Sequence, residues 1–291
     1  MKVEYNQNER ESEYEISVVI PTYNRSDLLQ ETLESLSYQQ LAKSRYEVIV
    51  VDDGSSDDTY QMLAPFFSRI NLSYIYQEDL GFRAAEARNK GIASAKSDIV
   101  LMIESGMVLP NNLLEKHLDK YKESEVDSLI GFGYGFNEFE TLHESELLRL
   151  QTEYGYKGIF NYFKETDKFD DCRIKILKDN YASFLKSQYK YLIFWTCHVS
   201  VKRSHLMAVG MFDTNFTCWG GEDVELAIRL QKYGSRFDLL FDSIAYHQPH
   251  SKDKNAVKAS SDQNVKYIKN KHCHIPDGLF DSSWEVGLLK A

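Results

Sequence analysis

Apolar and polar positions alternate in blocks through the first half of the chain. Short apolar runs that are typical of strands occupy residues 16–20, 47–51, 72–76 and 99–103. Apolar residues at helical spacing follow these runs, at residues 26–36, 59–67, 84–96 and 111–123. Continuous apolar strands that alternate with helices predict an α/β fold, in which helices flank a mostly parallel sheet.

Ligands of such sheets bind beyond the carboxyl ends of the strands. We therefore expect residues 22–25, 52–55 and 104–106 to share one crevice. After residue 127 the alternation is less regular, and strands are predicted at 128–136, 194–201 and 237–246. Residues 137–192 are rich in tyrosine, phenylalanine and lysine, an aromatic enrichment that suits either a core or a surface that contacts a sugar or a partner. The polar tail contains helical spacing near residues 263–271.

Composition narrows the class of protein. The 291 residues carry a net charge of −10 without a basic stripe, which argues against a nucleic-acid partner. No apolar run approaches the ~20 residues that an integral membrane segment needs. The four cysteines have no metal-ligand spacing, and residues 1–15 lack the apolar core of a signal peptide. These features lead us to expect free thiols and a cytoplasmic location.

A segment with unusual chemistry precedes the predicted helix that starts at Glu222. Gly220 and Gly221 permit backbone conformations closed to other residues and let a substrate approach closely. Glu222 and Asp223 occupy the first turn, where the helix dipole favours negative charge. One interpretation is an acidic helix start; the other is a carboxylate beside Trp219 that acts as a general base.

The ends of the predicted strands also carry candidate chemistry. Asp53, followed by Gly54, suits hydrogen bonds to a base or ribose, and it equally suits an ordinary Asp-Gly turn. Arg88 lies on a predicted helix, and it is either a functional residue or part of a charged face exposed to solvent. Glu104 follows a buried strand, so its carboxylate needs a cation, a hydrogen bond or solvent. Together these positions indicate a nucleotide and a divalent cation.

In order and spacing, four segments resemble glycosyltransferase family 2. They are Pro21–Arg25, Val51–Asp57, Ala87–Gly91 and Glu104–Gly106. Residues 209–223 resemble the C-terminal galactosyltransferase-type module found in many members. The resemblance implies the GT-A fold, a Rossmann-like arrangement with a C-terminal acceptor-side subregion. It also implies transfer from a nucleotide-sugar, mostly with inversion of the anomeric centre.

The resemblance assigns roles to individual residues. Asp223 is expected to be the catalytic base, and Glu222 to orient the acceptor or donor. Trp219, Gly220 and Gly221 are expected to contact a sugar. The donor and its nucleotide are expected to be bound by Pro21, Thr22, Tyr23, Asn24, Arg25, Asp52, Asp53, Arg88, Asn89, Glu104 and Ser105.

The metal-binding position departs from the family pattern. Glu104 stands where the family's Asp-x-Asp motif begins, whereas Gly106 at its end offers no side-chain ligand. His247 and His250 compete for the position of a metal-binding histidine. We expect Mn²⁺ or Mg²⁺ to be held by Glu104, a histidine, diphosphate oxygens and water.

These inferences divide the chain into functional regions. They are a polar leader at 1–15, a nucleotide-sugar-binding half at 16–127, an acceptor and catalytic half at 128–250, and a C-terminal tail at 251–291. An aromatic-rich insert at 137–192 interrupts the recognisable motifs, and we expect it to face the acceptor. The expected reaction moves a hexose or N-acetylhexosamine from a UDP-sugar to a saccharide, a small metabolite or a peptide. Alternatives are a catalytically weak nucleotide-sugar-binding protein and a sugar-phosphate nucleotidylyltransferase.

Overall fold

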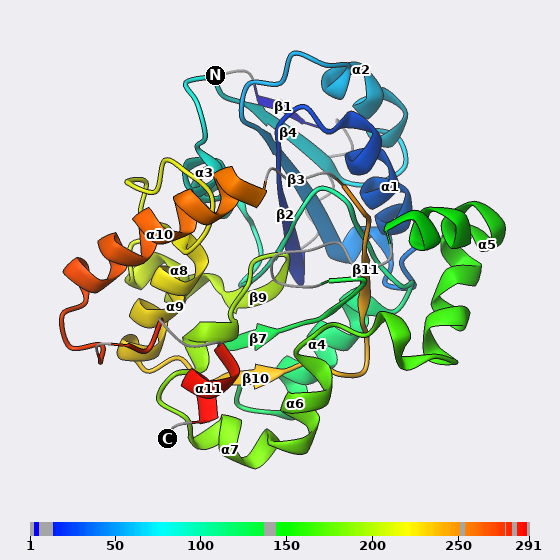
Figure 1. Cartoon of the computed structure of the whole chain (residues 1–291). Helices are drawn as coiled ribbons and strands as arrows, with labels where there is room; N and C mark the ends of the chain where they lie inside the picture. Colours follow the sequence, from blue (N-terminus) through cyan, green and yellow to red (C-terminus); the bar gives the residue numbers. More distant parts are fainter. Residues whose placement is uncertain are drawn as a thin grey trace.

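The computed structural model describes residues 3–5, 14–136, 144–250, 254–276, 278–280 and 284–289. Within these residues, eight strands form one sheet in the order β1-β4-β3-β2-β5-β9-β7-β10 (Figure 1). Their bounds are β1 Val3–Tyr5, β2 Ile16–Thr22, β3 Tyr46–Asp52, β4 Leu72–Tyr76, β5 Ile99–Ile103, β7 Ser128–Ile130, β9 His198–Lys202 and β10 Phe237–Leu239. β1 and β9 are antiparallel to their neighbours, and the other strands share one direction.

A second sheet continues from the carboxyl ends of three of these strands. In the described part of the chain it consists of β6 (Met107–Val108), β11 (Ala245–His247) and β8 (Gly133–Tyr134), in that order. The single strands predicted at 128–136 and 237–246 are therefore wrong, because each segment forms two strands in different sheets. Gly131 lies at the first break, where a Cβ would stand 2.3 Å from the ring of His198.

Helices cover both faces of the large sheet. α1 (Ser26–Ser37), α2 (Thr59–Leu63) and α4 (Leu113–Glu123) lie on one face, and α3 (Ala84–Ser94), α8 (Arg203–Ala208) and α9 (Glu222–Tyr233) on the other. The remaining helices are η1 Lys43–Arg45, η2 Ala64–Phe66, α5 Glu144–Lys164, η3 Asp167–Phe169, α6 Ile174–Asp179, α7 Tyr181–Lys186, η4 Lys190–Ile193, α10 Lys254–Lys271 and α11 Trp284–Leu289. Val18 and Ile20 point to the first face and Val19 to the second, as the period of a strand requires.

The first half of the chain matches the predicted alternation closely. β4 and β5 have the predicted bounds, and the helices predicted from 26 to 123 all form, although α2 continues as the 3₁₀ helix η2. Further on, β9 starts at His198 rather than at residue 194, because η4 and a turn precede it. β1 adds a strand inside the predicted polar leader. None of the helices in the described ranges has both the length and the hydropathy of a membrane span.

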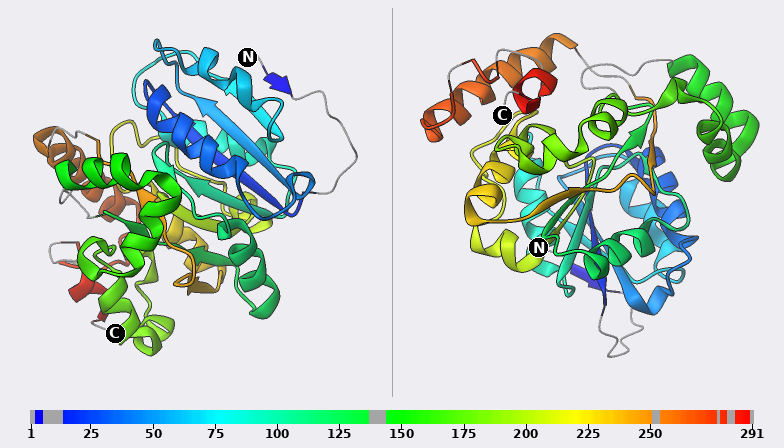
Figure 2. Two further views of the ribbon diagram at one scale, coloured as in Figure 1. Left: turned by 90° about the vertical axis from the view of Figure 1, so that its right-hand side faces the viewer. Right: turned by 90° about the horizontal axis from the view of Figure 1, so that it is seen from below.

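Residues 137–143 of the aromatic-rich segment lie outside the described ranges, and the part from 144 onward forms the helices α5, η3, α6, α7 and η4. α5 is interrupted at Gly155, whose φ is 61° and ψ 173°, so it consists of two helical pieces. Figure 2 shows α5 projecting from one side of the molecule.

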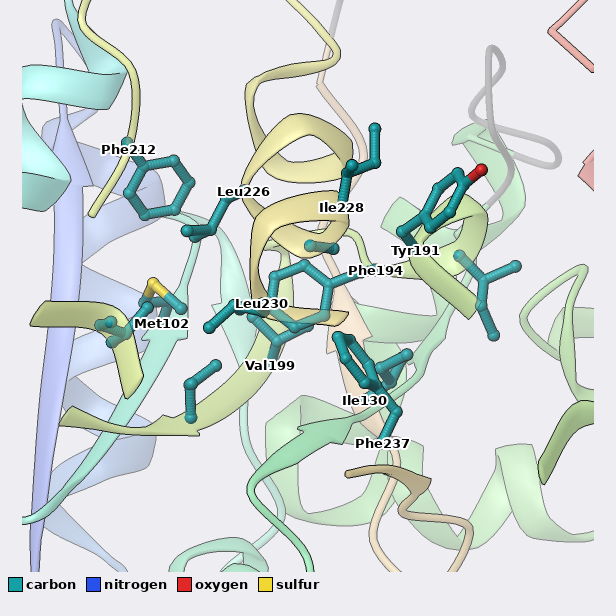
Figure 3. Close-up of a cluster of buried hydrophobic side chains, with 14 of the residues drawn as sticks. Met102, Ile130, Tyr191, Phe194, Val199, Phe212, Leu226, Ile228, Leu230 and Phe237 are labelled. Atoms are coloured by element: carbon teal, nitrogen blue, oxygen red, sulfur yellow. The ribbon is translucent and has the colours of Figure 1, made fainter. Parts of the chain in front are cut away.

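α9 carries the Glu222-Asp223 pair and is anchored to the sheet by apolar side chains. Leu226 and Leu230 are fully buried in a cluster that includes Met102 of β5 and Val199 of β9 (Figure 3). Burial of a leucine side chain contributes roughly 1.5–3 kcal/mol. The N-terminus of α9 is thereby held in a defined position relative to the ends of the strands.

Candidate active site

The ends of β2 and β3 are joined by a network around Asn24. Thr22 lies opposite Asp52 in the parallel register, and the Asn24 N–H donates to Ser55 Oγ at 2.8 Å. Asn24 Oδ1 accepts from the backbone N–H of Ser56 at 2.8 Å and, less closely, from that of Asp57 at 3.3 Å. The two predicted loops therefore form one structural unit.

Asp52 and Asp53 are both buried and both hydrogen-bonded. Asp52 accepts from the Ser55 N–H at 2.8 Å and from the Tyr74 hydroxyl at 2.7 Å. Asp53 accepts from Gln77 Nε2 at 2.5 Å and from the Arg83 N–H at 2.8 Å. Burial raises the pKa of Asp53, and these two bonds oppose the shift. A nucleotide bound at Asp53 would share this carboxylate with Gln77 and Arg83.

The end of β5 meets the end of β2. The Ser105 hydroxyl donates to the Pro21 carbonyl at 2.9 Å, so the loop after β5 contacts the end of β2 directly. Tyr23 is exposed, and its hydroxyl donates to Asp79 at 3.0 Å. Arg25 is half-buried immediately before α1. The structure thus brings together the three strand ends that the sequence predicted to meet.

Arg88 and Asn89 link α3 to the C-terminal motif. The Arg88 side chain is 5% exposed, so the solvated charged face considered from the sequence is wrong. Its Nη1 donates to Glu222 Oε1 at 2.8 Å, and its Nη2 lies 3.9 Å from Glu104 Oε1. Asn89 exchanges two 2.8 Å hydrogen bonds with the backbone of Phe212. Arg88 therefore lies between the carboxylates of two distant motifs.

The start of α9 holds two carboxylates in different environments. Gly220 and Gly221 have φ of 92° and 88°, which favours glycine at both positions. Glu222 is buried against Arg88, whereas Asp223 is half-buried and accepts from the Val224 N–H at 2.7 Å and the Thr196 N–H at 3.2 Å. Burial and the charge of Glu222 raise the pKa of Asp223 to about 7, against the opposing effect of Arg88. A carboxyl group with such a pKa is suited to general base chemistry.

Asp223 lines a pocket of about 440 Å³. Its walls are formed by Glu104, Phe136, Leu192, Trp195, Thr196, Cys197, Trp219, Gly220, Gly221, Glu222, Asp223, Val224, Ser261, Val265, Ile268, Leu279, Phe280 and Trp284. The chain has three tryptophans, and all of them line this pocket. Of the segment expected to face the acceptor, 137–192, Leu192 lines the pocket. One wall is lined by six residues of the tail, which are Ser261, Val265, Ile268, Leu279, Phe280 and Trp284. Sequence reasoning missed this wall, although a tryptophan in a polar tail was a usable signal.

The predicted metal ligands lie on adjacent segments. β11 pairs with β6 so that His247 is opposite Met107, and the Gln248 N–H donates to the Gly106 carbonyl at 2.9 Å. The ring of His250 is 5.1 Å from that of His247. No three His, Cys, Asp or Glu side chains are placed to hold an ion in the described ranges. Gly106 has φ of 103°, a conformation that disfavours the aspartate of the family motif.

Comparison with known sequences identifies the family. The profile of "Glycosyl transferase family 2" matches residues 17–198, and that of "N-terminal domain of galactosyltransferase" matches residues 179–251. The chain belongs to glycosyl transferase family 2. One relative of known name is the validoxylamine A glucosyltransferase of Streptomyces hygroscopicus subsp. jinggangensis, which is 31% identical to this chain over 272 residues. The alignment covers 93% of this chain and 63% of that relative, so the chain spans less than two thirds of its length.

Solved structures of glycosyltransferases share the fold of this family 2 chain. The mannosyltransferase PcManGT from Pyrobaculum calidifontis, in complex with GDP-Man and Mn²⁺, superposes with a TM-score of 0.62 at 16% identity, covering 94% of this chain and 67% of that one. S. aureus TarS 1-349 in complex with UDP-GlcNAc gives 0.61 at 19% identity, covering 94% and 77%. These likenesses confirm the predicted α/β fold of the GT-A type.

Proposed function

We propose that this chain is an inverting glycosyltransferase that moves a hexose or N-acetylhexosamine from a UDP-sugar to an acceptor nucleophile. The observation that carries the proposal is the pocket in which Asp223 and Glu222 lie beside Glu104. Glu104 follows a strand end where GT-A donors are expected, and Asp223 lies in the first turn of α9 on the same pocket. Donor and acceptor chemistry can therefore meet at one place.

UDP is the proposed nucleotide. Two findings support this choice. One of the structures that share the fold is TarS in complex with UDP-GlcNAc, and the Streptomyces relative is named a glucosyltransferase. The fold also accommodates GDP-Man in PcManGT, so the base must be read by individual residues. Asp53 is our candidate, because its carboxylate lies at the carboxyl end of β3 within the joined loops.

The pocket beside Asp223 is the proposed acceptor site. Trp219, Phe136 and Trp195 offer half-buried aromatic faces on which a ring can stack, while the carboxylates at one end can bind hydroxyl groups. Trp195 and Trp284 pack edge to face at 6.1 Å, so part of this aromatic wall is preorganised. A volume of about 440 Å³ suits a ring-sized group of a saccharide, a metabolite or a peptide conjugate.

The proposed reaction is a single displacement. The acceptor oxygen forms a bond to the anomeric carbon while the bond from that carbon to the diphosphate oxygen breaks, and the electron pair leaves with UDP. Asp223 takes the acceptor proton, which contributes typically 10²–10⁴-fold to the rate. Attack from the face opposite the leaving group inverts the anomeric centre.

Arg88 explains why Asp223, rather than Glu222, is the proposed base. Arg88 Nη1 donates to Glu222 Oε1 at 2.8 Å, so the carboxylate of Glu222 is already engaged by a guanidinium group, whereas that of Asp223 accepts from two backbone N–H groups. The charge of Glu222 in turn increases the proton affinity of its neighbour Asp223. The guanidinium group of Arg88 thus places Glu222 and Asp223 in different environments, which suits these two carboxylates to different roles.

A divalent ion would be bound jointly by the protein and by the diphosphate of the donor. Glu104 and His247 offer an oxygen and a nitrogen ligand from adjacent segments, which Mn²⁺ accepts, and the remaining positions would fall to diphosphate oxygens and water. When bound, the ion would offset the negative charge of the departing diphosphate. PcManGT, a protein of the same fold, was solved with Mn²⁺.

A donor panel tests the proposed function. We expect the purified protein to hydrolyse UDP-sugars faster than GDP-sugars, and to transfer the sugar with inverted anomeric configuration as seen by NMR. Binding of a UDP-sugar without any turnover would instead indicate a nucleotide-sugar-binding protein. Formation of a UDP-sugar from a sugar phosphate and UTP would indicate a nucleotidylyltransferase.

Asp53→Ala is expected to weaken UDP binding by about 1.5–3 kcal/mol, the scale of a hydrogen bond to a charged group. Calorimetry with UDP measures the change. Asp58→Ala removes an exposed carboxylate from the same loop and should leave the affinity unchanged. Equal UDP affinity in wild type and Asp53→Ala would mean that Asp53 is only a turn residue.

Removal of divalent ions is expected to lower transfer, because the protein supplies few ligands and the diphosphate supplies the others. Activity should fall in EDTA and return with Mn²⁺ or Mg²⁺, and calorimetry should show Mn²⁺ binding more tightly when UDP is present. Glu104→Ala and His247→Ala should raise the metal concentration needed, whereas His274→Ala, an exposed histidine elsewhere, should not. Full turnover in excess chelator would show that the ion is dispensable.

A further inference from the structure

α10 lies C-terminal to the residues matched by both family profiles, yet it packs on the motif that starts α9. Figure 1 shows α10 beside α9. Its contacts recur at helical spacing on one face of the helix. Tyr267 donates to Asp213 at 2.8 Å, and Lys271 pairs with Asp213 at 2.5 Å and with Glu225 at 2.8 Å.

Asn264, on the same face of α10, contacts the turn before α9 directly. Its side chain is buried, with 4% of the residue exposed. Asn264 Nδ2 lies 3.1 Å, 3.2 Å and 2.6 Å from the carbonyl oxygens of Cys218, Trp219 and Gly220. The Cys218 thiol donates to Asn264 Oδ1 at 3.4 Å, which supports this orientation of the carboxamide. The amide group of Asn264 therefore contacts three successive carbonyl oxygens.

The turn needs such a donor because of its backbone conformation. Gly220 and Gly221 both have positive φ, residues 218–221 lie outside helices and strands, and the carbonyls of 218–220 all lie against the Asn264 amide. Buried carbonyl groups without donors cost free energy comparable to a lost hydrogen bond. A Cβ at Gly221 would lie 3.1 Å from Ile268 and 3.6 Å from Asn264, so the turn and α10 are in close contact.

We infer that Asn264 is a positioning residue of the active site, which holds the 218–221 turn and thereby places Trp219 and Asp223 in the pocket. Its catalytic consequence rests on the proposed function. Asn264 acts through the turn, because its carboxamide is occupied by backbone groups. A polar side chain outside both family profiles thus determines where the proposed base stands.

Substitution by the isosteric acid separates hydrogen bonding from shape. Asn264→Asp keeps the volume but replaces the NH₂ donor by a carboxylate oxygen that faces three carbonyl oxygens. We expect kcat to fall by ~10- to 100-fold, the scale of a misplacement of about 1 Å, with KM for the donor changed by less than about threefold. Asn264→Ala should lose no more activity than Asn264→Asp, because it removes the donors without adding repulsion.

Tyr267→Phe is the matched control. It removes the hydrogen bond from α10 to Asp213 and leaves the carboxamide in place, so it should retain the wild-type kcat. Loss of kcat in Tyr267→Phe equal to that in Asn264→Asp would overturn the inference, because docking of α10 would then be its only role. Wild-type kcat in Asn264→Asp would overturn it as well.

Hydrogen exchange gives a readout that does not need activity. We expect the amides of residues 218–223 to exchange faster in Asn264→Asp and Asn264→Ala than in wild type or Tyr267→Phe. Unchanged exchange in both Asn264 variants would contradict the inference. A wild-type protein that transfers no sugar would refute the proposed function, and the exchange experiment would still test the role of Asn264 in holding the turn.

Discussion

Asp223→Asn is expected to lower kcat by about 10²–10⁴-fold, the contribution of a general base, while UDP affinity stays within a few-fold of wild type. The amide cannot take the proton of the acceptor. Its near-identical shape keeps the pocket and the donor side in place, at the loss of one of the two backbone hydrogen bonds that the carboxylate accepts. Steady-state kinetics measures the loss, and calorimetry with UDP measures the retained affinity.

The pH dependence gives an independent signature of the same group. Because the pKa of Asp223 is raised to about 7, the group is protonated and inactive at acidic pH, and kcat/KM should rise with pH through this range. The residual activity of Asp223→Asn should lack this rise. Asp262→Asn, which removes an exposed carboxylate from α10, is the control and should keep both the rate and the profile. Wild-type turnover in Asp223→Asn would exclude this residue as the base.

Arg88→Met is expected to destabilise the protein by about 3–5 kcal/mol, because it leaves the charge of Glu222 buried without its partner. Glu222 is 6% exposed, and among the described residues its Oε2 has no hydrogen-bond partner that could compensate. Urea denaturation measures the free energy of unfolding. The same variant should lose transfer activity, since it removes the charge that distinguishes Glu222 from Asp223.

A double substitution tests the physical reason for that loss. Arg88→Met with Glu222→Gln removes the unpaired charge as well, and should recover much of the lost stability although two groups are changed. Arg45→Met breaks an ion pair with Glu15 in which both side chains are more than a third exposed, and should cost less than about 1 kcal/mol. If Arg88→Met and Arg45→Met cost the same, the Arg88–Glu222 pair is not a buried ion pair in solution.

Much of the fold follows from local patterns in the sequence. The runs that form β2 to β5 are apolar on both faces, and the helices between them have apolar stripes, so the alternation alone predicts a covered parallel sheet. Parallel strands place their carboxyl ends at one edge, and Asp53 and Ser105 therefore contact the end of β2 as predicted. The order of the motifs was sufficient to identify the family.

The later strands could not be predicted in the same way. Residues 128–136 and 237–246 have strand-like composition throughout, but each changes sheets part-way. The change at Gly131 depends on the ring of His198, which comes from a strand 67 positions further on and leaves no room for a Cβ. Composition within a short window contains no information about such a neighbour.

The sequence by itself determined the α/β core, the family and the presence of Glu222 and Asp223 at a helix start, because these depend on local periodicity and on motif order. Only the tertiary structure decided how the site is assembled. Arg88 pairs with Glu222 across 134 positions, and Asn264 of the polar tail binds the turn before α9. Trp284 completes the wall of the pocket. These contacts depend on how the sheet orders its strands and on where the last helices pack, and neither is encoded in the spacing of residues along the chain.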